Sequence, residues 1–200
     1  MAQTTKTWTW DSSNESFTLT ESSGAGTFTR DTSNGSPTNG SLYQNGEVGR
    51  NKAGTGQAIL EGVTWETLGV PAGATVNSIR VSEVRTYSGL TFWVSADTCD
   101  YLVDVQDAST QASVTGSTLW TRNTTAQDGS WQTGSNSLAS VQASYQASTT
   151  SLDILITITT DNANNSSAHV SGHLDYLNLT IDYTEGGGGG GGARSTIVRV

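Results

Sequence analysis

The 200-residue sequence is poor in three kinds of residue: it contains one cysteine, two prolines and nine lysines or arginines. A single cysteine, Cys99, excludes a disulfide within the chain, so stability must come from core size or from oligomerisation. We expect Cys99 to be a small buried apolar residue and not a nucleophile. Eighteen acidic residues give a net charge of −9. Nucleic-acid binding is disfavoured because no basic stripe is present to neutralise phosphates.

Long apolar stretches are missing as well. The sequence has no run of about eighteen apolar residues, so it predicts neither a transmembrane helix nor a membrane partner. Residues 1–11 lack the apolar segment of a secretion signal, and we expect a protein made in a host cytoplasm.

Serine, threonine, glycine and asparagine are abundant, and the apolar residues fall in short alternating clusters. Alternation with a period of two is typical of half-buried strands. The sequence therefore predicts an all-β, antiparallel jelly-roll-type β-sandwich. Strand candidates are residues 5–10, 17–20, 57–68, 76–87, 90–95 and 101–106, whereas residues 21–56 are expected to be loop-rich with short edge strands at most.

The C-terminal part of the sandwich gives the clearest patterns. Residues 152–158 and 177–183 both alternate strictly, and we interpret them as a long antiparallel hairpin through the core. Between the expected strands, Leu138, Val141 and Tyr145 are spaced i, i+3 and i+7, which favours a short helix over residues 137–147.

A change of composition ends the expected domain at residue 184. Residues 185–192 contain seven consecutive glycines, which indicate a flexible linker. Residues 193–200 form a β-prone arm with apolar tips. We expect Ile197, Val198, Arg199 and Val200 to dock onto a neighbouring subunit by strand addition. Addition to an edge of the chain's own sheet and disorder are the alternatives.

Two segments carry a family resemblance. The run LGVPAGATVNSIRV, residues 68–81, resembles a segment of cell-surface and phage-associated β-sandwich modules such as DNRLRE domains. The run HLDYLNLTIDYT, residues 173–184, is similar to the final strand of many jelly-roll domains. The resemblance implies a turn at Pro71–Gly73 that leads into a core strand, and it assigns no chemistry.

The whole sequence resembles tailed-bacteriophage virion proteins in its composition and layout, since it is acidic, rich in small polar residues and ends in a glycine-tethered arm. This likeness implies a structural role in the virion, as a capsid decoration protein, head fibre or tail component. The expected partners are other copies of the chain, as a trimer, and capsid or tail subunits. A carbohydrate-binding or receptor-binding module is the alternative.

Two of the six tryptophans bear on that alternative. Trp120 and Trp131 lie in polar segments, where an exposed ring would stack on a sugar or anchor a protein partner. The other interpretation is that each ring caps the core.

Enzymatic and metal-dependent functions are not expected, and we predict no cofactor. His169 and His173 lie about 13 Å apart on a strand, too far to share one ion, and we expect surface or turn positions for both. A glycosidase needs two carboxylates within about 10 Å, and spacing does not exclude such a pair in an acidic series formed by Asp97, Asp100, Asp104 and Asp107. Asx-turns explain the Asp- and Asn-rich loops better than calcium sites do.

Overall fold

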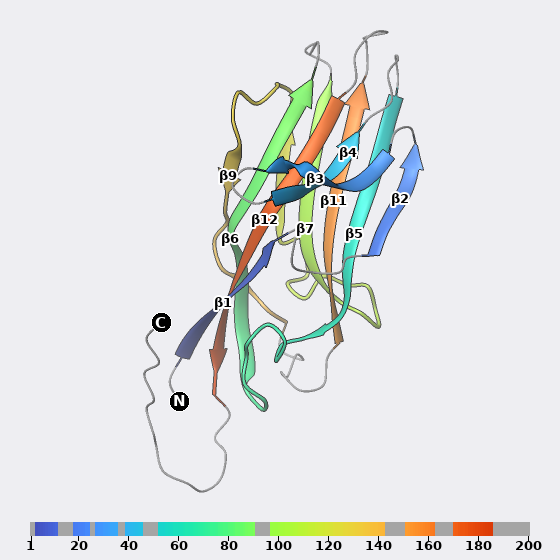
Figure 1. The fold of residues 1–200 in the computed structure, drawn as a ribbon. Helices are drawn as coiled ribbons and strands as arrows, with labels where there is room; N and C mark the ends of the chain where they lie inside the picture. The colour runs from blue at the N-terminus through green and yellow to red at the C-terminus, as the bar shows by residue number, and fades with distance from the viewer. Residues whose placement is uncertain are drawn as a thin grey trace, which may run out of the picture.

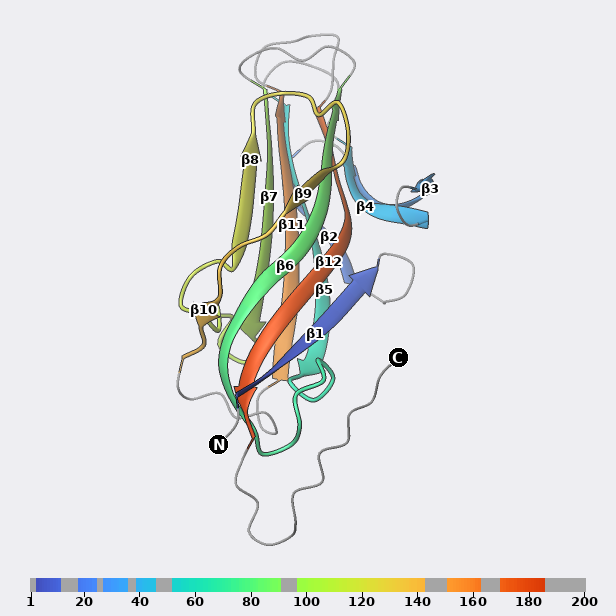
Figure 2. The same cartoon turned by 90° about the vertical axis from the view of Figure 1, so that its left-hand side faces the viewer.

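The computed structural model of the chain describes residues 3–11, 18–24, 27–35, 39–45, 52–90, 97–142, 151–162 and 170–185. These residues form twelve strands in two antiparallel sheets that pack face to face (Figures 1 and 2). Within these ranges no helix is long and apolar enough to cross a membrane.

Seven strands form the first sheet, called sheet A. They are β1 (Gln3–Asp11), β3 (Thr27–Gly35), β4 (Asn39–Asn45), β6 (Thr75–Leu90), β9 (Gln132–Gly134), β10 (Ala139–Ser140) and β12 (Val170–Thr184). Strand β12 is central: it pairs with β6 on one side and with β4 and then β1 on the other. Strands β9 and β10 pair with the far edge of β6.

Five strands form the second sheet, called sheet B. Their order is β2 (Thr18–Gly24), β5 (Lys52–Thr64), β11 (Ser151–Asn162), β7 (Thr98–Asp107) and β8 (Trp120–Thr124). Figure 2 shows this sheet behind β6 and β12 of sheet A.

The chain crosses between the sheets at most connections. The exceptions are β3 to β4 and β9 to β10, which stay in sheet A, and β7 to β8, which stays in sheet B. The result is one four-strand set in the order β4-β12-β6-β9 facing another in the order β5-β11-β7-β8, which is the jelly-roll arrangement. The expected all-β jelly-roll sandwich is confirmed.

The core lies between the sheets and follows the period-2 pattern of the sequence. Ile154, Ile156 and Ile158 of β11 are fully buried, and Leu177 and Leu179 of β12 face them from the other sheet. Alternate positions on β11 and β7 point to the outer face of sheet B, because successive strand residues lie on opposite faces.

The expected hairpin between the last two alternating runs is wrong. Strand β11 pairs with β5 and β7, whereas β12 pairs with β6, β4 and β1. The two strands are the central members of opposite sheets, so their apolar residues meet across the core and not side by side. Alternation reports which face of a strand is buried, and it carries no information about the strand's neighbours.

Two further expectations need correction. Residues 137–142 are not helical: β10 lies within them, Leu138 is 46% exposed and Val141 is buried. Residues 21–56 are richer in strand than expected, since β3 and β4 pair with each other and bring Phe28 and Leu42 into the core. The partner strand β12, and not local hydrophobicity, holds β4 in place.

The turn before β6 agrees with the resemblance in that segment. The amide of Ala74 donates to the carbonyl of Pro71 over 3.1 Å, and Gly73 has a φ of +74°. This is the conformation of a type II turn, in which glycine is favoured at the third position. The turn leads into the buried residues Val76 and Ile79 of β6.

Candidate functional site

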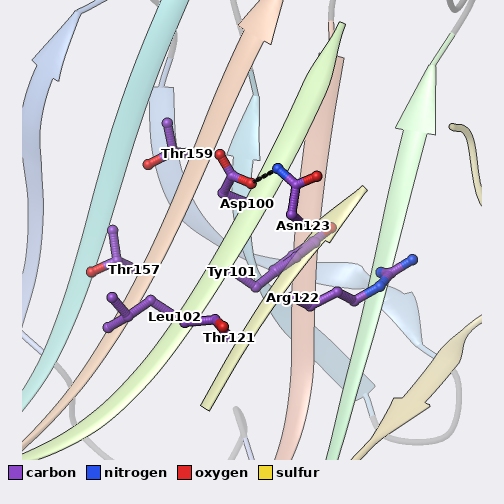
Figure 3. A pocket seen from close by; sticks show the side chains of 8 residues that line it. All are labelled: Asp100, Tyr101, Leu102, Thr121, Arg122, Asn123, Thr157 and Thr159. Atoms are coloured by element: carbon purple, nitrogen blue, oxygen red, sulfur yellow. Dashed lines mark hydrogen bonds between the residues drawn. The ribbon is translucent and has the colours of Figure 1, made fainter. Parts of the chain in front are cut away.

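The outer face of sheet B contains a hollow of about 240 Å³ over strands β11, β7 and β8 (Figure 3). Eight residues line it: Thr157 and Thr159 of β11, Asp100, Tyr101 and Leu102 of β7, and Thr121, Arg122 and Asn123 of β8. The side chains of Tyr101 and Arg122 make their hydrogen bonds on the inner side of the sheet, and the other six stand on its outer face. The backbone of β7 and β8 forms the floor between them.

Strand register arranges these side chains in two rows. Thr55, Thr159, Asp100 and Asn123 lie opposite one another on β5, β11, β7 and β8. The second row, two residues further along each strand, consists of Gln57, Thr157, Leu102 and Thr121. At about 4.8 Å between strands, each row extends about 14 Å across the sheet.

The first row is held by hydrogen bonds between its side chains. The Asn123 amide nitrogen donates to a carboxylate oxygen of Asp100, and the hydroxyls of Thr55 and Thr159 lie 3.0 Å apart. In the second row, among the described side chains, the hydroxyls of Thr157 and Thr121 make no hydrogen bond within the protein. These two hydroxyls are therefore available to a ligand.

Strand β8, which forms one wall of the hollow, is anchored from its inner side by Arg122. The guanidinium donates to the Asp128 carboxylate over 2.5 Å and to the Thr86 hydroxyl over 2.8 Å. Asp128 also accepts the amide of Ser88 over 2.7 Å and is only 8% exposed. Arg122 thus connects the edge of sheet B to β6 of sheet A, and it points away from the hollow (Figure 3).

The inner face beneath the hollow is closely packed. The Tyr101 hydroxyl donates to the backbone carbonyl of Tyr87 over 2.8 Å and lies 2.7 Å from the Ser88 hydroxyl. A Cβ on Gly172 of β12 would come within 2.6 Å of Cys99, so only glycine fits there. Burial raises the pKa of the Cys99 thiol from 9.0 to about 12, which agrees with the expectation of a buried, unreactive cysteine.

The acidic series, Asp97 just before β7 and three aspartates on it, does not converge on one point. Asp97 is fully buried, Asp100 borders the hollow, and Asp107 accepts hydrogen bonds from Ser109 and Thr110 in an exposed turn. Asp104 accepts from the amide of Val105 and the hydroxyl of Ser113, and burial raises the pKa of its carboxyl. Asp100 and Asp104 are about 13 Å apart along the strand.

The structure separates the two tryptophans that the sequence singled out. Trp120 is 7% exposed, and its ring packs beneath Gly134, where a Cβ would come within 2.7 Å of it. Of the two interpretations offered for Trp120, core capping agrees with the structure, because β8 turns this residue toward the core and leaves its ring unavailable for stacking on a sugar. Trp131 is partly exposed and lies just before β9, outside the core.

Trp131 belongs to an aromatic cluster on the outer face of sheet A. Its ring lies 5.7 Å from that of Tyr87 and 6.2 Å from that of His173, centroid to centroid, and the rings of Tyr87 and His173 are 5.8 Å apart. His173 was expected in a surface or turn position, but it is a strand residue that is 5% exposed. The register of β12 against β6 places it beside Tyr87.

Other expected site residues fall outside the described ranges. His169 is one, and the arm residues Ile197, Val198, Arg199 and Val200 are the rest. Over the ranges that the structure covers, no group of three or more His, Cys, Asp or Glu side chains is arranged to hold a metal ion.

Sequence reasoning missed the hollow itself. The alternating pattern of β11 and β7 identified their inward, buried residues. The hollow is lined by the outward residues of the same strands, Thr157, Thr159 and Leu102. The signal was present as threonine alternating with isoleucine in residues 156–159. Only the strand order reveals that these threonines lie beside Asp100 and Asn123.

No family model and no curated protein matches the sequence. Among solved structures, a carbohydrate-binding module of the β-sandwich superfamily with promiscuous specificity is similar at 14% identity and a TM-score of 0.43. The match covers 84% of this chain and 57% of that one. A module specific for non-crystalline cellulose is similar at 13% identity and a TM-score of 0.39, with 84% and 88% of the two chains covered.

A glycoside hydrolase domain, Endo-D from Streptococcus pneumoniae R6, is similar at 8% identity and a TM-score of 0.43. The match covers 82% of this chain and 21% of that one. At these TM-scores and identities the similarities assign neither a ligand nor a site residue to this chain.

Proposed function

We propose that this chain is a non-catalytic module that binds carbohydrate in the hollow on the outer face of sheet B. The observation that carries the proposal is the combination of two available hydroxyls, on Thr121 and Thr157, with the Asp100–Asn123 pair around an apolar centre at Leu102. Ligand sites are concave surfaces in which a few polar groups fix orientation around an apolar contact.

A saccharide matches this arrangement chemically. Each sugar ring has hydroxyls around its edge and C–H groups on its faces. The C–H groups would contact Leu102. The ring hydroxyls would donate to the Asp100 carboxylate, and they would donate to or accept from the threonine hydroxyls. Because the lining residues stand on paired strands, their positions are fixed before the ligand arrives, and this lowers the entropic cost of binding.

Binding without hydrolysis is the simpler proposal for this site. Hydrolysis of a glycosidic bond by two carboxylates requires them within about 10 Å of each other. Asp100 is the carboxylate that lines the hollow. Asp104, about 13 Å away along β7, is already occupied by hydrogen bonds from Ser113 and Gln106.

The test removes the two available hydroxyls without changing side-chain shape. A double variant, Thr121→Val with Thr157→Val, is compared with the wild type on an array of neutral oligosaccharides, and hits are measured by isothermal titration calorimetry. We expect binding to weaken by roughly tenfold or more, at about 1 kcal/mol for each lost hydrogen bond. The folded state should keep its stability, because neither hydroxyl has a partner within the described protein.

Two further variants make the result specific. Thr7→Val removes an exposed strand hydroxyl from β1 of sheet A and should leave binding unchanged. Trp131→Ala tests the aromatic cluster on that sheet. Loss of binding in Trp131→Ala, with the threonine variants unaffected, would move the site to sheet A and overturn the proposal.

The virion role expected from the sequence stays a prediction, as do the trimer and the capsid or tail partners. Its mechanism depends on residues 193–200, which lie outside the described ranges. A module that binds carbohydrate and one that assembles through a terminal arm are compatible. Truncation at Thr184 followed by light scattering separates the two, because saccharide binding should persist whether or not an oligomer dissociates.

A further inference from the structure

The hydrogen-bonding groups of the hollow are unequally divided between donors and acceptors. The Asn123 amide nitrogen donates to Asp100. This bond orients the amide so that its carbonyl oxygen is left for a ligand, together with the second carboxylate oxygen of Asp100. Thr121 and Thr157 add hydroxyls that act in either sense. The second N–H of the Asn123 amide is a fixed donor, so the side chains that face the hollow offer two fixed acceptors against one fixed donor.

The charge of the hollow has the same bias. Asp100 is the charged side chain that faces it, and the nearest cation on the wall, Arg122, is directed to the other side of β8. There its guanidinium is bound by Asp128 and Thr86. An anionic ligand would meet a carboxylate without a compensating positive charge, and the chain as a whole carries a net charge of −9. Juxtaposed like charges are unfavourable and serve to reject wrong ligands.

We infer that the hollow selects neutral saccharides, which donate hydrogen bonds from adjacent hydroxyls, and rejects uronic and sulfated saccharides. Asp100 is the residue that determines this specificity, and Asn123 is a positioning residue that holds its carboxylate. The inference rests on the proposed function and adds to it the chemical class of the ligand.

The experiment measures binding to matched pairs of saccharides that differ only in charge. The probes are array glycans that pair glucose with glucuronate, galactose with galacturonate and an unsulfated disaccharide with its sulfated form. For the wild type we expect the neutral member of a pair to bind roughly tenfold more tightly, or better. This preference should shrink as salt is raised, because ions screen the repulsion at an open site.

In the Asp100→Asn variant, the affinities for the neutral and acidic members of a pair should differ by no more than about threefold. The substitution removes the charge and keeps an acceptor oxygen at a similar position. Asn123→Leu should weaken binding to neutral glycans and leave the rejection of acidic ones in place, because the Asp100 charge remains. Glu61→Gln is the matched control: it changes the net charge equally at an exposed position of β5 away from the hollow, and the preference should not move.

The outcomes distinguish this inference from the proposed function. If glycans bind and the Thr121/Thr157 variant loses them, but acidic and neutral members bind alike, the site stands and the inference is wrong. An unchanged preference in Asp100→Asn overturns it as well. If no glycan binds at all, both the proposed function and the inference fail.

Discussion

Two aspartates on the outer faces of the two sheets show how similar side chains take different roles. Asp182 of β12 in sheet A accepts hydrogen bonds from Thr5 over 2.6 Å and from Ser78 and Gln3 over 3.4 Å each, and it is 6% exposed. Asp100 of β7 in sheet B accepts from Asn123 and borders an open hollow. One carboxylate is surrounded by donors of its own chain, while the other keeps capacity for a ligand.

The difference follows from the neighbouring strands. Asp182 lies between β1 and β6, and both place a hydroxyl beside it. Among the described side chains, Asp100 has a donor on β8 alone, because its partner on β11, Thr159, lies beside the hydroxyl of Thr55. A polar group that is fully satisfied within the protein supports stability, whereas an unsatisfied acceptor at a concave surface is suited to binding.

The largest effect is expected beneath the hollow, at the residue that anchors its wall. Arg122→Met should lower the free energy of unfolding by about 3 kcal/mol, because it leaves the buried Asp128 carboxylate without its cation. Chemical unfolding followed by tryptophan fluorescence measures the loss. Arg122→Lys keeps the positive charge but cannot bind Asp128 and Thr86 with the geometry of a guanidinium. Its free energy of unfolding should lie between those of the wild type and Arg122→Met. If Arg122→Met lowers the free energy of unfolding by less than about 0.5 kcal/mol, the Arg122–Asp128 ion pair contributes no more than a surface ion pair does.

The two aspartates themselves give the direct comparison. Asp182→Asn should cost about 1–2 kcal/mol of stability, since one oxygen acceptor is lost amid several donors, and it should leave saccharide binding unchanged. Asp100→Asn should have little effect on stability and a clear effect on ligand preference. Thermal unfolding and calorimetric titration of both variants test this crossed pattern. If Asp100→Asn is the more destabilising of the two, the division between a structural and a binding carboxylate is wrong.

Much of the fold was predictable from the sequence because burial leaves a period-2 record. The alternation in residues 152–158 and 177–183 located the two central strands, and Pro71 and Gly73 marked the turn before β6. The pairing of those strands was not predictable, because alternation looks the same for neighbours in one sheet and for strands that face each other across a core. Leu138, Val141 and Tyr145 suggested a helix because three apolar positions fit more than one period.

The site was less predictable than the fold. The sequence suggested Trp120 because its ring lies in a polar segment. Whether such a ring is exposed depends on which face of its strand it occupies, and on β8 Trp120 faces the core. The hollow is formed by threonine, asparagine, leucine and one aspartate, which do not stand out in a chain so rich in small polar residues. They form a site because the register of β11, β7 and β8 brings them together on one face of the sheet, and register is a property of the tertiary structure.

Two other aspartates of β7 extend the comparison to the pH dependence of stability. Burial raises the pKa of Asp104 above its ordinary value of 3.8, whereas hydrogen bonds from Ser109 lower the pKa of Asp107. A raised pKa in the folded state contributes stability below the unfolded pKa, and this contribution is lost as pH rises through the folded value. A lowered pKa contributes above the unfolded value, and the contribution is lost as pH falls through the folded one.

The smallest expected effects are therefore opposite in sign. As pH falls from about 6 to about 3, Asp104→Asn should lose stability relative to the wild type and Asp107→Asn should gain, because each variant lacks one of the two titrating groups. Urea unfolding at closely spaced pH values measures both difference curves. The exposed turn at Asp107 makes its curve the shallower one and the more sensitive to salt. Curves that slope in the same direction would show that the buried Asp104 is solvated like its exposed neighbour, and that the outer face of β7 is open well beyond the hollow.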